Sequence, residues 1–166
     1  MIRHEPHPLS TLLPPMTDHE YCALRSDISA NGLIHPILLF EDKTLDGNNR
    51  EGACEETGVE PRYEVFIGDY AAARARVLSG IRHRHLTPSQ SSLIAGRLAT
   101  TSHGGDRKSD HARKSGLDAM TIKQAAAQVS INEDTARKGY VVVQSGDLEL
   151  IAKVERKEKS IKGRSE

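Results

Sequence analysis

The residues best suited to chemistry lie in one short turn, residues 45–50 (LDGNNR), which follows an apolar run and opens a segment ending at Gly58. Glycine lets a backbone approach a ligand closely, and the free N–H groups at a helix N-terminus favour anions. An arginine beside such a turn can fork onto phosphate oxygens. The turn therefore predicts a phosphate or nucleic-acid site at Gly47, Asn48, Asn49 and Arg50. An ordinary hairpin-to-helix turn with surface charges is the alternative.

A dense cationic stretch, Arg82, His83, Arg84 and His85, stands just before another helix start. Its charge suits phosphate, so these four residues are predicted to help close the same site. A histidine can also move protons in hydrolysis. His83 and His85, together with Asp46, are accordingly the candidates for catalytic groups. The alternative is a solvated basic loop.

Composition indicates a soluble protein with a modest core. The chain has 166 residues, of which 37% are hydrophobic and 28% charged, and its formal net charge is zero. It contains no apolar run long enough to span a bilayer and no signal-peptide pattern, which predicts a cytoplasmic protein without membrane contact. Cys22 and Cys54 are too few for a disulfide framework or a zinc site, so no bound metal is expected from them.

The elements that must position these residues alternate between helix and strand over about the first 100 residues. Proline excludes helix from the lead-in at 1–15, and helix caps, among them a capping box at Thr17 and Glu20, and apolar periodicity mark the rest. Further along the chain, a capping box at Thr121 and Gln124 and a cap at Asn132 are predicted to open two later helices. Helices are predicted at 17–31, 50–57, 69–78 and 87–101, and strands at 33–40, 44–45 and 62–67. This order predicts an α+β domain at 1–101, with a small mixed sheet flanked by helices.

A polar, glycine-bearing segment at 102–119 is predicted to be a flexible linker. The region 120–166 then shows a helix, a three-residue turn and a second helix, followed by a last helix and a charged tail. That spacing is typical of a helix-turn-helix. Its second helix is predicted to present Thr135, Arg137, Lys138 and Tyr140 to duplex DNA. A purely structural helical hairpin is the alternative, because Glu133 and Asp134 in the first turn of that helix would repel nearby phosphates.

The order of these features resembles the ParB/sulfiredoxin superfamily, and specifically plasmid- or phage-type proteins with a ParB-like N-terminal domain. The segments that carry the resemblance are residues 31–37 (NGLIHPI), 45–50 (LDGNNR) and 84–88 (RHLTP), followed by the helix-turn-helix. The resemblance implies a ParB/sulfiredoxin-like domain that binds a nucleotide, CTP or ATP with Mg, and a second domain that binds DNA.

The resemblance carries over only in part. Gly47, Arg50 and Ala53 match the first phosphate motif of ParB proteins, in which a second arginine stands where this chain has Gly52. The catalytic cysteine of sulfiredoxins is replaced by Asn48, so cysteine repair is not expected.

In ParB proteins a later Glu-Asn pair helps to hold a metal-bound triphosphate. Ser79 and Gly80 occupy those places here, so the groups on the metal side are missing.

The function predicted on this basis is DNA binding by a ParB-like protein with a nucleotide or phosphate pocket, acting in plasmid or phage partition or in regulation. Duplex DNA, a nucleotide and a second copy of the chain are the expected partners. Two alternatives stay open: a ParB-like nuclease or NTPase that uses the same pocket, and a mobile-element regulator that acts through protein contacts.

Overall fold

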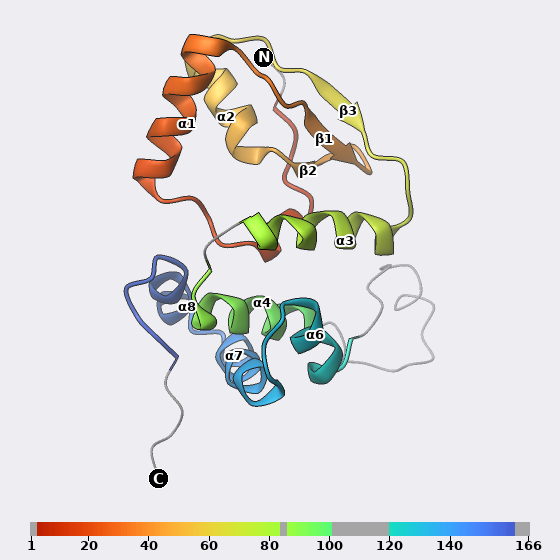
Figure 1. The fold of residues 1–166 in the computed structure, drawn as a ribbon, viewed down its shortest axis with the longest axis vertical. Helices are drawn as coiled ribbons and strands as arrows, with labels where there is room; N and C mark the ends of the chain where they lie inside the picture. Colours follow the sequence, from red (N-terminus) through yellow and green to blue (C-terminus); the bar gives the residue numbers. More distant parts are fainter. Residues whose placement is uncertain (1–2, 84–85, 101–119, 162–166) are drawn as a thin grey trace. The chain divides into compact units, whose positions relative to one another are not determined.

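The chain folds into two compact units, Met1–Val77 and Leu78–Glu166, which are treated separately below. The computed structural model describes residues 3–83, 86–100 and 120–161 (Figure 1). The first unit is α+β with a three-stranded mixed sheet, and the second is mostly helical, as the sequence predicts. None of the described helices is both long enough and apolar enough to cross a membrane.

The sheet of the first unit has the strand order β2-β1-β3. The central strand β1 (Ile37–Phe40) pairs antiparallel with β2 (Lys43–Asp46) and parallel with β3 (Tyr63–Val65). Two residues, Glu41 and Asp42, connect β1 to β2, and both have positive φ, 52° and 58°. Positive φ at both central residues is the backbone of the tight hairpin turn that matches strand twist. The turn sets the pairing of Phe40 with Lys43 and of Leu39 with Thr44, and a register shift beyond them brings Asp46, the last residue of β2, opposite Leu38.

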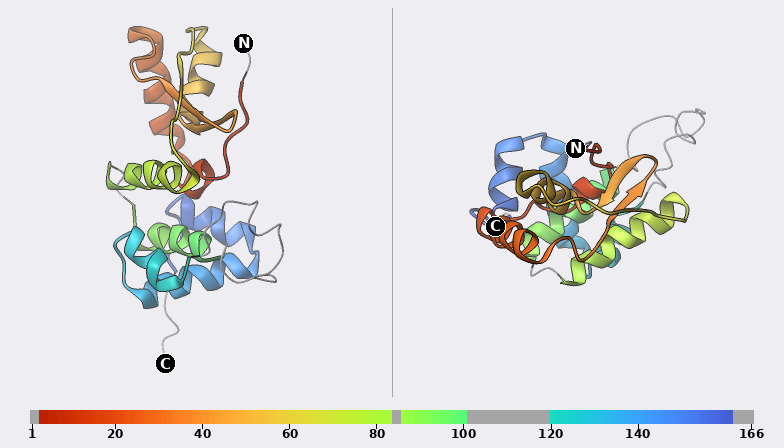
Figure 2. Two further views of the ribbon diagram at one scale, coloured as in Figure 1. Left: turned by 90° about the vertical axis from the view of Figure 1, so that its right-hand side faces the viewer. Right: turned by 90° about the horizontal axis from the view of Figure 1, so that it is seen from above.

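Three helices surround this sheet: α1 (Asp18–Asn31), α2 (Asn48–Thr57) and α3 (Tyr70–Ser79). The predicted capping box at Thr17 and Glu20 is present, and α1 ends at Gly32. Helix α2 lies between α1 and the sheet (Figures 1 and 2). Buried residues in this unit include one cluster of Ile28, Ala53 and Cys54 and another of Leu9, Leu45, Ala73 and Val77.

The first strand is shorter than the predicted 33–40. Pro36 has no N–H to give to a ladder. The carbonyls of Leu33 and Ile34 instead accept hydrogen bonds from Arg62 Nη2, at 3.1 and 2.6 Å. The third strand likewise occupies only part of the predicted 62–67. The elements exist where the sequence places them, and local hydrogen bonding sets their ends.

The proline-rich lead-in is extended, apart from one 3₁₀ turn at Ser10–Leu12. It runs beside β2, because the N–H of His7 donates to the carbonyl of Thr44 and the N–H of Thr44 donates to that of Glu5, both at 2.9 Å. The lead-in is therefore part of the folded unit, and it brings His4 against α2.

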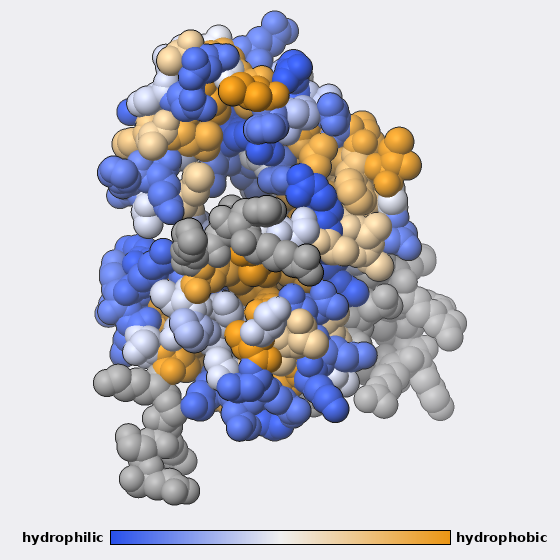
Figure 3. Space-filling model, in the orientation of Figure 1, coloured by the Kyte–Doolittle hydropathy of each residue, from blue (hydrophilic) through white to orange (hydrophobic). Residues whose placement is uncertain are grey.

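The far edge of the sheet carries exposed apolar side chains. Val65 on β3 is 75% exposed, and Ile67 in the connection to α3 is 94% exposed. Figure 3 shows hydrophobic residues at this edge of the first unit.

The second unit is built on α4 (Pro88–Thr100), against which α6 (Ile122–Gln128), α7 (Glu133–Ser145) and α8 (Leu148–Glu155) pack. Glycines at the α4–α7 crossing allow the closest approach. A Cβ on Gly96 would lie 2.7 Å from backbone atoms of Gly139, and a Cβ on Gly139 would collide with the backbone of Ser92. The units divide at Val77, whereas the predicted domain boundary is 101, because α4 packs with the C-terminal helices. The predicted linker 102–119 lies outside the described residues.

Candidate anion site and candidate nucleic-acid interface

The turn between β2 and α2 places an arginine directly over a glycine. Gly47 has φ 116° and is the N-cap residue of α2. A Cβ at this position would lie 3.0 Å from Arg50 Nη2 and 3.3 Å from Ile37 Cα. Both the positive φ and the crowding require glycine here. The group that approaches the backbone at Gly47 is the protein's own Arg50, and the approach of a ligand to the same turn stays a prediction.

Arg50 is held in place and keeps one donor unused. Its Nη2 donates to the carbonyl of Pro36 at 3.3 Å and lies 3.5 Å from Asp46 Oδ1. Its Nε is buried and has no hydrogen-bond partner among the described residues. The side chain as a whole is 24% exposed. A buried donor without a partner is energetically costly, and an anion would reach Arg50 through the part of the guanidinium that stays exposed.

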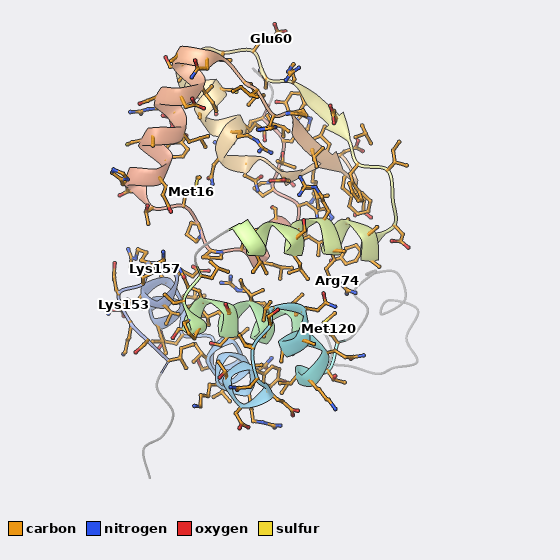
Figure 4. All side chains as sticks on the ribbon, in the orientation of Figure 1. Met16, Glu60, Arg74, Met120, Lys153 and Lys157 are labelled. Atoms are coloured by element: carbon orange, nitrogen blue, oxygen red, sulfur yellow. The ribbon has the colours of Figure 1, made fainter. Side chains whose placement is uncertain are left out.

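A second arginine, from α3, meets the same acid. Arg76 Nη2 donates to Asp46 Oδ2 at 3.0 Å, and the two side chains are 42% and 38% exposed. One carboxylate thus lies between two guanidinium groups from two helices. Arg74 leaves α3 on the side away from the sheet (Figure 4), as expected for residues about 200° apart around a helix. Sequence analysis missed Arg76, and only its position beside the core residue Val77 could have suggested that it faces the sheet.

A buried acid lies next to Arg50 in sequence. Glu51 is 2% exposed, and its carboxylate oxygens have four partners. They accept from the N–H of His4 (2.9 Å), Thr44 Oγ1 (2.8 Å) and the Tyr63 hydroxyl (3.1 Å), and His4 Nδ1 lies at 3.1 Å. Sequence analysis missed this network also. The available signal was spacing, since Glu51 shares a helix face with the buried Cys54 three residues later.

This network shifts two pKa values. Burial by itself would raise the pKa of Glu51, but the hydrogen bonds from His4, Thr44 and Tyr63 outweigh it and hold the pKa below the ordinary value. Burial and the Glu51 charge raise the pKa of Tyr63 to about 12. Glu51 is therefore an ionised structural anchor for the lead-in, β2, α2 and β3. With its oxygens already occupied, it is unsuited to act as a base or a metal ligand.

Burial, with a further contribution from Glu51, also raises the pKa of the Cys54 thiol. A raised pKa disfavours the thiolate that nucleophilic chemistry needs.

The other predicted phosphate-site residues stand as follows. Asn48 and Asn49 are the first two residues of α2 and are half-buried. Arg82 and His83 belong to a 3₁₀ turn, Gly80–His83, at the start of the second unit. Arg84 and His85 lie outside the described residues. The structure thus brings together Asp46, Gly47 and Arg50, and a joint pocket with the cationic stretch stays a prediction.

The α6–α7 pair has a short, well-capped turn. Ser130 adopts a left-handed conformation with φ 57°, and the Asn132 side chain accepts from the N–H of Thr135 at 2.8 Å to start α7. Ala125, Ala126 and Ala136 are buried where the helices meet α4 and each other. The predicted arrangement of helix, short turn and helix is therefore present.

The predicted DNA-facing side chains of α7 are not equally exposed. Arg137 and Lys138 are exposed, whereas Thr135 and Tyr140 are half-buried. Arg137 Nη2 donates to Glu133 Oε1 at 2.8 Å. Figure 3 shows a hydrophilic surface over α7, but its charges cancel, because Glu133 and Asp134 oppose Arg137 and Lys138.

Within the described part of the chain, no group of three His, Cys, Asp or Glu side chains could hold a metal ion. Comparison with known proteins gives no match, either to a protein-family model or to a curated protein.

Proposed function

We propose that this is a DNA-binding protein of ParB-like type, acting in plasmid or phage partition or in regulation. One observation carries the proposal: α6 and α7, joined by a short capped turn and packed on α4, leave Arg137 and Lys138 exposed on one side of α7. A second helix supported in this way is the element with which helix-turn-helix proteins enter the major groove.

On duplex DNA, Arg137 and Lys138 would contact phosphates, and Thr135 near the start of α7 would lie closest to base edges. Phosphate contacts release counterions, so each one adds about 0.9 to the slope of log affinity against log salt. The affinity is therefore expected to fall steeply as salt is added.

The first unit would add a phosphate pocket at Gly47 and Arg50, and a nucleotide such as CTP or ATP is the proposed ligand. The partly exposed side chain of Arg50, positioned beside Gly47 and the carbonyl of Pro36, supports this part of the proposal. The acids beside the pocket do not fit a magnesium ion held by the protein. Asp46 lies between two arginines and Glu51 is occupied by its hydrogen bonds. The same pairing of Asp46 gives no support to the nuclease or NTPase alternative.

The test is fluorescence anisotropy of labelled duplexes of varied sequence with the full chain, at low and at physiological salt. Lys138→Gln and Arg137→Gln are each expected to weaken binding by roughly threefold to tenfold, because each removes about one phosphate contact. Lys153→Gln is the matched control, since Lys153 on α8 also has a helical ion pair, with Glu149 (Figure 4). Undetectable binding at low salt, or equal weakening by the control, would contradict the proposal.

A regulator that acts through protein contacts is the second candidate, and the exposed Val65 and Ile67 at the sheet edge favour it. It predicts that a protein partner binds at this sheet edge and that Ile67→Ser abolishes this binding. It also predicts that neither DNA nor nucleotide binds. Detection of duplex binding that depends on Lys138 would decide against it.

A further inference from the structure

We infer that Asp46 is an internal ligand that occupies an oxyanion site shared by Arg50 and Arg76, and that this site takes a phosphate group presenting two free oxygens. The inference rests on the proposed phosphate pocket and adds two elements to it. One is a second cationic arm, Arg76. The other is a competitor supplied by the chain itself.

The geometry is that of a bridged anion. Each arginine uses its Nη2 on a different oxygen of the same carboxylate, Arg50 on Oδ1 at 3.5 Å and Arg76 on Oδ2 at 3.0 Å. A phosphate offers two non-bridging oxygens in the same bridging manner, and arginine is well suited to it because its donors form a planar fork. The carboxylate of Asp46 stands in for such a group.

Charge and exposure favour the exchange. Two guanidinium groups face the one carboxylate of Asp46. Ion pairs at this level of exposure are weak, and Asp46, at 38% exposed, can turn towards water. Arg50 does not need to move, because the carbonyl of Pro36 and the backbone at Gly47 hold it. Glu51 does not compete for Arg50, since its oxygens accept hydrogen bonds from other groups.

If Asp46 is an internal ligand, removing it has the opposite effect on ligand binding from removing a catalytic acid or a metal ligand. A catalytic or metal-binding carboxylate supports ligand binding or turnover, so its removal weakens one or both. An internal competitor opposes ligand binding, so its removal strengthens binding even without a metal.

The experiment is calorimetric titration of the full chain with pyrophosphate in the presence of EDTA, using wild type, Asp46→Asn, Arg76→Gln and Arg50→Gln. Asp46→Asn is expected to raise the affinity about threefold to thirtyfold, the equivalent of two partly exposed ion pairs. Arg76→Gln is expected to lower it about fivefold or more. Glu56→Gln is the matched control and is expected to change nothing, because Glu56 pairs with Arg25 at 3.0 Å, away from the turn.

The outcomes separate the inference from the pocket. An affinity that falls or stays constant in Asp46→Asn overturns the inference, and so does an unchanged affinity in Arg76→Gln. If pyrophosphate binding depends on Arg50 but not on Asp46 or Arg76, the pocket stands and the internal ligand is wrong. If neither wild type nor Asp46→Asn binds, both are wrong. Thermal unfolding checks that each variant folds, and should Asp46→Asn fail to fold, the predicted loss in Arg76→Gln decides the question.

Discussion

Each unit presents an arginine that lies four residues after an acid and pairs with it. Arg50 follows Asp46 in the first unit, and Arg137 follows Glu133 in the second. The pairs share the same i,i+4 spacing, yet the Arg50 side chain is 24% exposed and the Arg137 side chain is 60% exposed. Arg50 also lies against the carbonyl of Pro36 and the backbone of Gly47, and its acid is shared with a second arginine, Arg76. The Arg137 side chain is instead mostly exposed to solvent.

The two pairs have the same spacing in sequence, so the difference in exposure comes from the residues that pack around each arginine. A covered arginine has lost more of its water, so its interactions are screened less and its position is more restricted. An exposed arginine is screened and can swing between partners. Binding at Arg50 should therefore respond to the scaffold beneath it, and binding at Arg137 mainly to the charges beside it.

The largest effect is expected when the packing of α7, the helix that carries Arg137, is disrupted. Gly139→Ala puts a methyl group into the backbone of Ser92 at the α4–α7 crossing. Helices cannot separate locally without losing their packing, so the second unit should lose roughly 4 kcal/mol, the upper end for an overpacked core. Chemical denaturation monitored by circular dichroism measures this loss, and duplex binding should disappear with it.

Gly146→Ala is the control, because Gly146 has φ 68° but open space around its Cα. It should cost only about 1 kcal/mol. Phosphate binding by the first unit should survive Gly139→Ala. Its loss would show that the two arginines do not depend on separate supports.

The support of Arg50 is tested by Glu51→Gln. The substitution removes a buried charge that accepts from His4, Thr44 and Tyr63, and it puts an amide donor where donors already converge. A loss of roughly 3 kcal/mol is expected. Glu56→Gln, on the exposed surface of the same helix, should cost well under 1 kcal/mol. Equal losses in urea denaturation would contradict the assignment of Glu51 as an anchor.

The same network predicts a pH dependence with a defined sign. The folded pKa of Glu51 lies below its ordinary value of 4.5, so its contribution to stability is complete above that value and is lost as the pH falls through the folded pKa. The pKa of Tyr63 is raised from 10.0 to about 12, so its contribution is complete below pH 10.0 and is lost as the pH rises towards 12. The unfolding free energy of Glu51→Gln, measured against pH, should lack the share of the acid-side loss that Glu51 contributes.

The sequence predicted the turn at 45–50, the caps of α1 and α6 and the Asn132 cap of α7, because those signals lie within a few neighbouring residues. It did not predict Arg76, whose partner is 30 residues away on another element. It also did not predict that Glu51 is buried, since an acid in a polar helix has the same local signature whether it faces water or a ring of donors. Arg137 was placed on the outward side of its helix from the sequence, whereas the covering of Arg50 was out of reach, because tertiary packing decides it.

A smaller effect is expected from Gly47→Ala, which tests how closely Arg50 depends on the glycine below it. The added Cβ would meet both Arg50 Nη2 and the backbone of Ile37 at a φ that favours glycine. Strain of roughly 2 kcal/mol is expected, together with weaker pyrophosphate binding as the guanidinium is displaced. Gly58→Ala, at the other end of α2, has φ 73° and open space, so it should leave binding unchanged. Unaltered binding in Gly47→Ala would show that Arg50 is not fixed by the turn.

The smallest effect is expected from Glu133→Gln, which removes the acid from the exposed pair. Arg137 then loses its partner, and the exposed face of α7 changes from neutral to a net charge of about +1. Because the pair is exposed and screened, duplex affinity should rise only about twofold to threefold at low salt. The gain should shrink further at physiological salt, where the Debye length is about 8 Å. In the first unit, Asp46→Asn should give the larger gain for phosphate, since Arg50 is covered. If Glu133→Gln instead raised duplex affinity more than tenfold, Arg137 would be held as firmly as Arg50. The contrast between the two arginines would then fail.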